Sequence, residues 1–187
     1  MMDGPLSRLQ SHWVYGGALA GVLLLVLAPL LISGLTPAGT LVYLGLAAYM
    51  IHQYEEHDAD RFRRFVNRTL LRGHERLTTR TVFVINIFGV WAVLAATFWA
   101  TERLGPGWAT VSGWFLVVNG LAHLGLALAM RRPNPGLWTG VLIFLPLGLH
   151  TLATLRPTVP TLHSLLALLF ILGLHAVIVA SVARAQR

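Results

Sequence analysis

The chain has 187 residues, of which 56% are hydrophobic and 11% are charged, and its mean hydropathy is +0.68. This composition is too apolar for a soluble domain, so the sequence predicts an all-α, polytopic bundle of transmembrane helices. The chain has no cysteine, which excludes thiolate catalysis, Cys-ligated metal sites and disulfides and leaves His, Glu and Asn to carry any chemistry.

Six apolar segments are long enough to cross about 30 Å of hydrocarbon, which requires about 20 residues each. They lie near residues 14–35, 39–56, 81–100, 108–130, 137–155 and 161–183. The second is the least apolar, because it ends in a polar stretch that begins at His52. We therefore expect about six spans within a single integral membrane domain that covers residues 1–187.

Residues 57–80, between the second and third spans, alternate Arg with apolar residues at near-helical spacing. This pattern is typical of an amphipathic helix that lies on anionic headgroups, so membrane lipid is an expected partner. A nucleic-acid partner is not expected, because the net charge of +7 is explained by a basic membrane face.

Basic residues also predict the orientation of the bundle. All fourteen are Arg, and in a six-span arrangement only Arg103 and Arg156 fall on one side. The other twelve share the opposite side: Arg8, the seven Arg between residues 61 and 80, Arg131, Arg132, Arg184 and Arg187. By the positive-inside rule, both termini and residues 57–80 are predicted to be cytoplasmic.

The candidate site begins at the end of the second span, in the sequence His52-Gln-Tyr-Glu55-Glu56. Offsets of three and four residues place His52, Glu55 and Glu56 on one helix face. Ionisable residues at membrane depth are functional candidates by default, although two Glu can also simply end a span.

Other spans carry polar residues to a similar level. At 1.5 Å of rise per residue, His52 lies roughly 9 Å from Asp58 along its helix, and His123 roughly 12 Å from Arg131. Asn119 shares a helix face with His123, one turn deeper. Asn86 and His175 reach a comparable depth, as a polar pocket in the cytoplasmic half would require. The candidate catalytic residues are therefore His52, Glu55, Glu56, Asn119 and His123.

These motifs resemble the HXXEE-domain family of bacterial integral membrane proteins. The resemblance spans roughly residues 40–146 and rests on His52-x-x-Glu55-Glu56, Asn86, Asn119-x-x-x-His123 and Pro133-Asn134-Pro135-Gly136. The family's Tyr-x-Pro-Gly turn is matched only in Pro135 and Gly136, since Pro133 stands in place of the Tyr. The resemblance implies a multi-pass protein of the bacterial inner (plasma) membrane, and it implies no particular reaction.

Two imidazoles and two carboxylates are a suitable ligand set for a divalent metal ion, with His52, Glu55, Glu56 and His123 as ligands and Asn119 orienting one of them. Three alternatives remain open. A Glu can act with His in metal-free acid–base catalysis, the set can couple proton or ion transport, or it can simply hold the helices in register. We favour an enzyme that acts on a lipophilic small molecule.

Overall fold

The computed structural model describes residues 4–184 and contains no strand within them, so the predicted all-α class is confirmed. Arg187, which the charge count includes, lies outside these residues. The helices are α1 (Pro5–Leu31), α2 (Pro37–His57), α3 (Arg61–Phe65), α4 (Thr79–Val84), α5 (Ala92–Leu104), α6 (Ala109–Met130), α7 (Leu137–Thr139), α8 (Leu145–Leu155) and α9 (Thr161–Arg184). Short π-helical turns, Ile85–Trp91 and Gly140–Phe144, join α4 to α5 and α7 to α8 into two continuous helices.

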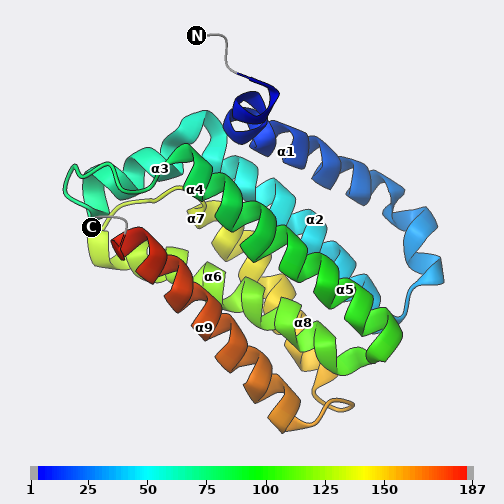
Figure 1. Cartoon of the computed structure of the whole chain (residues 1–187). Helices are drawn as coiled ribbons and strands as arrows, with labels where there is room; N and C mark the ends of the chain where they lie inside the picture. The colour runs from blue at the N-terminus through cyan, green and yellow to red at the C-terminus, as the bar shows by residue number, and fades with distance from the viewer. Residues whose placement is uncertain (1–3, 185–187) are drawn as a thin grey trace.

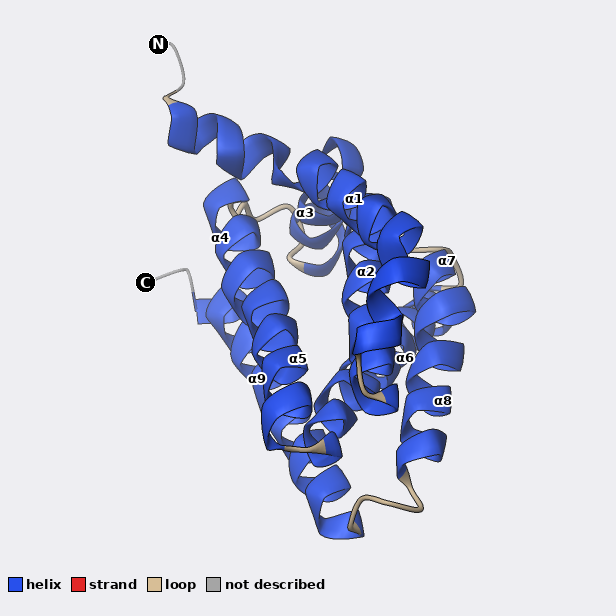
Figure 2. Ribbon diagram, turned by 90° about the vertical axis from the view of Figure 1, so that its right-hand side faces the viewer, coloured by secondary structure: helices blue, strands red, loops and turns tan. Residues whose placement is uncertain are grey.

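The described part of the chain therefore forms six long helices, which run back and forth along one bundle (Figure 1). Five of them are long and apolar enough to cross a membrane: Pro5–Gly34, Thr79–Leu104, Pro106–Met130, Leu137–Leu155 and Thr161–Ala183. The chain is thus a multi-pass membrane protein. An even number of long helices brings the start of α1 and the end of α9 to the end of the bundle that carries α3 (Figures 1 and 2).

Helix α2 is less apolar than these five helices, and it is also the most enclosed by its neighbours. It packs against α1, α5, α6 and α8, and thirteen of its 21 residues are buried, including His52 and Glu56. A helix surrounded by other helices needs no lipid-facing surface, so it can carry polar side chains if they pair inside the protein. The start of α2 is capped by the Thr36 side chain, which accepts a hydrogen bond from the Gly39 amide at 2.9 Å.

The Arg-rich segment after α2 is only partly helical. Helix α3 continues into a π-helical turn, Val66–Leu70, and the chain then leaves the helix at Arg72 and Gly73, which both have positive φ. The loop folds back because the buried Asn67 side chain donates to Leu77 O and accepts from Leu77 N, each at 2.9 Å. The near-helical spacing predicted for residues 57–80 therefore corresponds to helix only as far as Leu70.

Candidate functional site

Glu56 is the centre of a buried polar cluster that three parts of the chain build. Its Oε2 lies 3.6 Å from His52 Nε2 and its Oε1 lies 3.6 Å from His123 Nε2. His52 is one turn earlier on α2, while His123 comes from α6, and the two imidazole ring centroids are 5.0 Å apart. One ligand atom from each of the three residues lies within 4.8 Å of the others.

The protonation of His52 follows from its partners. Glu55 can only accept hydrogen bonds as a carboxylate, and its Oε2 receives the Thr139 hydroxyl at 2.5 Å. The hydroxyl proton of Thr139 is thereby committed, so Thr139 Oγ1 accepts from His52 Nδ1, 2.7 Å away. Neutral His52 consequently presents an unprotonated Nε2 to Glu56, and this buried atom has no hydrogen-bond partner among the described residues.

His123 is held in the same way by a different residue. The Asn134 amide donates from Nδ2 to His123 O at 2.8 Å, which orients its Oδ1 toward His123 Nδ1, also at 2.8 Å. His123 Nδ1 therefore carries a proton, and Nε2 is the ring nitrogen that faces Glu56. Two imidazole Nε2 atoms and a carboxylate thus face one another at the centre of the site.

Gly136 closes the site from the turn that follows α6. Its φ is +89°, and a Cβ on this residue would lie 2.6 Å from His123 Cε1 and 2.8 Å from His52 Cε1. Both rings therefore pack against a backbone that has room for no side chain. The Pro133-Asn134-Pro135-Gly136 turn positions both imidazoles, through the Asn134 amide and the bare Gly136 backbone.

Glu55, predicted as a metal ligand, faces a different group. It accepts from the backbone amides of Trp138 (3.1 Å) and Thr139 (2.7 Å) and so caps the start of the long helix 137–155. Glu55 thereby docks that helix onto α2 and fixes Thr139 beside His52.

A second polar chain reaches Glu56 from the opposite direction. His57 Nε2 lies 3.1 Å from Glu56 Oε2 and 3.3 Å from Asn86 Nδ2. Asn86 accepts from Gln53 Nε2 at 2.8 Å, and Gln53 in turn accepts from Trp91 Nε1 at 2.5 Å. Asn86 and Trp91 both belong to the π-helical turn Ile85–Trp91, a kind of irregularity that is frequent at functional sites.

Asn119 and His175 lie beside this cluster. The Asn119 side chain faces the Tyr49 hydroxyl, and the residue that hydrogen-bonds His123 is Asn134. The Tyr49 ring packs against the rings of His52 (5.8 Å) and Phe144 (4.6 Å). Tyr49 and Phe144 together form an aromatic wall beside His52.

Sequence reasoning did not assign Thr139, Asn134 or His57 to the site. Asn134 lies in a motif that reads as a turn, and His57 directly follows Glu56 at what reads as the membrane surface. Thr139 carries no signal of its own, because a single Thr near the start of an apolar helix is ordinary.

Comparison with protein families finds a family whose description names the motif His52-x-x-Glu55-Glu56. The family described as a protein of unknown function with HXXEE motif matches residues 43–151, which is more than half of the chain and includes most of α2, all of α6 and the turn before α7. Comparison with curated proteins and with solved structures gives no match.

Proposed function

The chain belongs to the HXXEE family, and we propose that His52, Glu56 and His123 bind a divalent metal ion at which a lipophilic substrate is transformed. We also propose that the protein acts in the bacterial plasma membrane, among its lipids, with this site near the cytoplasmic face.

The observation that carries the metal site is that both imidazoles direct Nε2 toward Glu56 while their Nδ1 atoms contact other residues. With both rings neutral and no cation, two unprotonated Nε2 atoms and a carboxylate would face one another in a buried space, which is electrostatically unfavourable. Metal-binding His residues usually donate their second ring N–H to a protein oxygen, as His52 does to Thr139 and His123 to Asn134. His57 at Glu56 Oε2 would support the carboxylate in the same manner.

The spacing of the ligand atoms supports the same assignment. Two ligand atoms that each lie about 2.0–2.1 Å from a tetrahedral zinc ion are separated by roughly 3.3–3.4 Å. The two Glu56–His separations are 3.6 Å, close to this value, and all three ligand atoms lie within 4.8 Å of one another, so the side chains would have to move closer together to coordinate one ion.

Three protein ligands leave a coordination position for water or substrate, as in catalytic rather than structural zinc sites. A divalent ion held there would supply Lewis acidity toward a substrate oxygen or lower the pKa of a bound water. The protein itself contributes a buried, oriented ligand set. Because the outer surface of the bundle is apolar and faces lipid, a substrate that reaches the site from the membrane would be lipophilic.

Metal content tests the proposal directly. Protein purified without a His tag should contain about one equivalent of a divalent metal by elemental analysis, and His52→Ala, His123→Ala and Glu56→Gln should lose it. Glu102→Gln is the matched control, because it alters a carboxylate that accepts from Thr36 at the other end of α2, and it should retain the metal. Metal-free wild type, or equal loss in Glu102→Gln, would contradict the assignment.

The enzymatic part needs a separate measurement. A bacterial total lipid extract incubated with metal-loaded wild type should show a changed lipid species by mass spectrometry, and Glu56→Gln should leave the extract unchanged. If wild type binds metal but changes no lipid, the metal site stands and catalysis on lipids is rejected.

A further inference from the structure

Three buried polar atoms next to the metal ligands have no hydrogen-bond partner among the described residues. They are the Tyr49 hydroxyl on α2, Asn119 Oδ1 on α6 and His175 Nε2 on α9. Burying an unpaired polar group is costly, so three of them in one region indicate a place that a polar ligand group fills.

Aromatic contacts bring these three residues together. The Tyr49 hydroxyl faces the Asn119 side chain, and the Phe115 ring packs against both Tyr49 (5.0 Å) and His175 (5.6 Å). The Tyr49 ring also packs against His52, so these residues adjoin the metal ligands. We call Tyr49, Asn119 and His175 the polar trio.

The donors and acceptors of the trio define which group would fit. His175 Nδ1 donates to Ile171 O at 2.8 Å, so its free Nε2 is an acceptor, as is Asn119 Oδ1. The Tyr49 hydroxyl is the donor among the three unpaired atoms. The hydroxyl of a neutral alcohol pairs two of these three atoms, since it donates to one acceptor and accepts from Tyr49.

Anionic groups fit this set poorly. A phosphate or carboxylate needs several donors or a cation, and the trio has two acceptors and lies near the Glu56 carboxylate. We propose that the polar trio binds the hydroxyl group of a neutral, lipid-soluble alcohol. This inference names the substrate's polar group, so its catalytic meaning rests on the proposed function.

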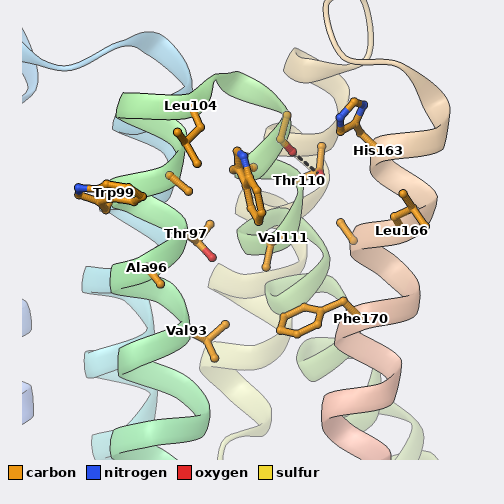
Figure 3. A pocket seen from close by; sticks show the side chains of 14 residues that line it. Val93, Ala96, Thr97, Trp99, Leu104, Thr110, Val111, His163, Leu166 and Phe170 are labelled. Atoms are coloured by element: carbon orange, nitrogen blue, oxygen red, sulfur yellow. Dashed lines mark hydrogen bonds between the residues drawn. The ribbon is translucent and has the colours of Figure 1, made fainter.

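An apolar groove provides a place for the hydrocarbon part of such a ligand. Its volume is about 570 Å³, and its walls come from α5, α6 and α9 (Figure 3). Exposed Trp99, Trp108 and Phe170 border it, so it opens sideways toward lipid. The volume is within the range of small-molecule sites, roughly 300–1,000 Å³.

The groove and two members of the trio, Asn119 and His175, lie along the contact between α6 and α9. Val111 in the groove is eight residues from Asn119, or roughly 12 Å along α6, and Phe170 is five residues from His175, or roughly 7.5 Å along α9. Phe115, which packs with Val111 in one core cluster, fills the seam between them. Its ring must rotate for one ligand to occupy both places.

Three probes of equal chain length test the inference: 1-dodecanol, dodecanoate and dodecyl phosphate. In nanodiscs, dodecanol should raise the melting temperature of wild type more than either anion does. Tyr49→Phe and Asn119→Leu should each weaken dodecanol binding about fivefold, the value of one lost hydrogen bond. Thr151→Val is the control, because the buried Thr151 hydroxyl already donates to Leu147 O.

Ligand-free stability gives an independent readout. Asn119→Leu should melt at a higher temperature than wild type, because an unpaired polar atom is replaced by an apolar group of similar size. Equal effects of alcohol and anions, or unchanged dodecanol binding in Tyr49→Phe and Asn119→Leu, would overturn the proposal. His52→Ala should keep dodecanol binding while losing metal, which separates failure of this inference from failure of the metal site.

Discussion

Glu55 and Glu56 are adjacent in sequence but differ in function because successive residues on a helix point about 100° apart. Glu56 points toward His52 and His123, whereas Glu55 points toward the amides that start helix 137–155. The same division separates the two residues between His52 and Glu55: Gln53 joins the buried polar chain and Tyr54 is exposed. The HXXEE motif therefore combines a candidate ligand pair with a helix cap.

Thr139 tests the orientation of His52. Thr139→Val removes the acceptor of His52 Nδ1–H, so metal affinity should fall by about 10–100-fold, the usual effect of removing such a supporting hydrogen bond. Thr139→Ser retains the hydroxyl and should restore most of the affinity. Chelator competition measures both, and an unchanged affinity in Thr139→Val would show that this contact does not orient the ring.

Gly136 tests the fit of the turn against the two rings. Gly136→Ala should abolish metal binding, because the added Cβ would lie 2.6 Å from His123 Cε1. Gly73→Ala is a close control, since Gly73 has the same φ of +89° and nothing within 4 Å of an added Cβ. Both variants should lose about 1 kcal/mol of stability through backbone strain. Metal analysis should show the loss in Gly136→Ala alone; metal loss in Gly73→Ala would contradict the argument.

At the scale of elements, close packing of α6 against the helix 137–155 holds His123 beside Gly140. Gly120 and Gly148 allow this approach, since a Cβ on Gly120 would lie 2.7 Å from Gly140 O and one on Gly148 would lie 2.8 Å from Gly113 O. Small residues at helix interfaces are the usual means of close approach in membranes. The π-helical turn Gly140–Phe144 lies at this interface and directs Phe144 against His52, at a ring distance of 4.3 Å.

Gly120→Ala should therefore force α6 away from its neighbour. We expect a loss of about 1–3 kcal/mol, the usual cost of overpacking, together with weaker metal binding. Gly125→Ala on the same helix is the control, because nothing lies within 4 Å of its added Cβ. Thermal unfolding and metal titration measure both effects. Equal behaviour of the two variants would show that the contact between the helices does not set the site.

At the scale of the whole molecule, the arginine distribution predicts which side of the membrane each end of the bundle faces. The cysteine-free sequence allows single cysteines to be introduced as reporters. Leu70→Cys, in an exposed position after α3, should be protected from an impermeant thiol reagent in intact cells. Ser33→Cys and Thr158→Cys, at the opposite end, should be labelled. Labelling of Leu70→Cys from outside would reverse the orientation and place the site near the outer face.

Hydropathy and helical spacing were sufficient to predict the fold class, because both depend on residues close together in the chain. They also predicted that His52 and His123 lie at a similar depth in the membrane, since depth follows from counting residues from the ends of a span. Helix α2 shows where this reasoning weakens: its polarity reads as a marginal span, although burial inside the bundle explains it.

Tertiary packing alone decided which atoms meet. Offsets of three and four residues both allow contact with His52, so the pattern did not distinguish Glu55 from Glu56. The contacts that separate them are long-range, as in the bond from Thr139 to Glu55 across 84 residues. Local sequence determines the depth and helix face of a side chain, whereas its partner is determined by the rotation and separation of helices that close packing sets.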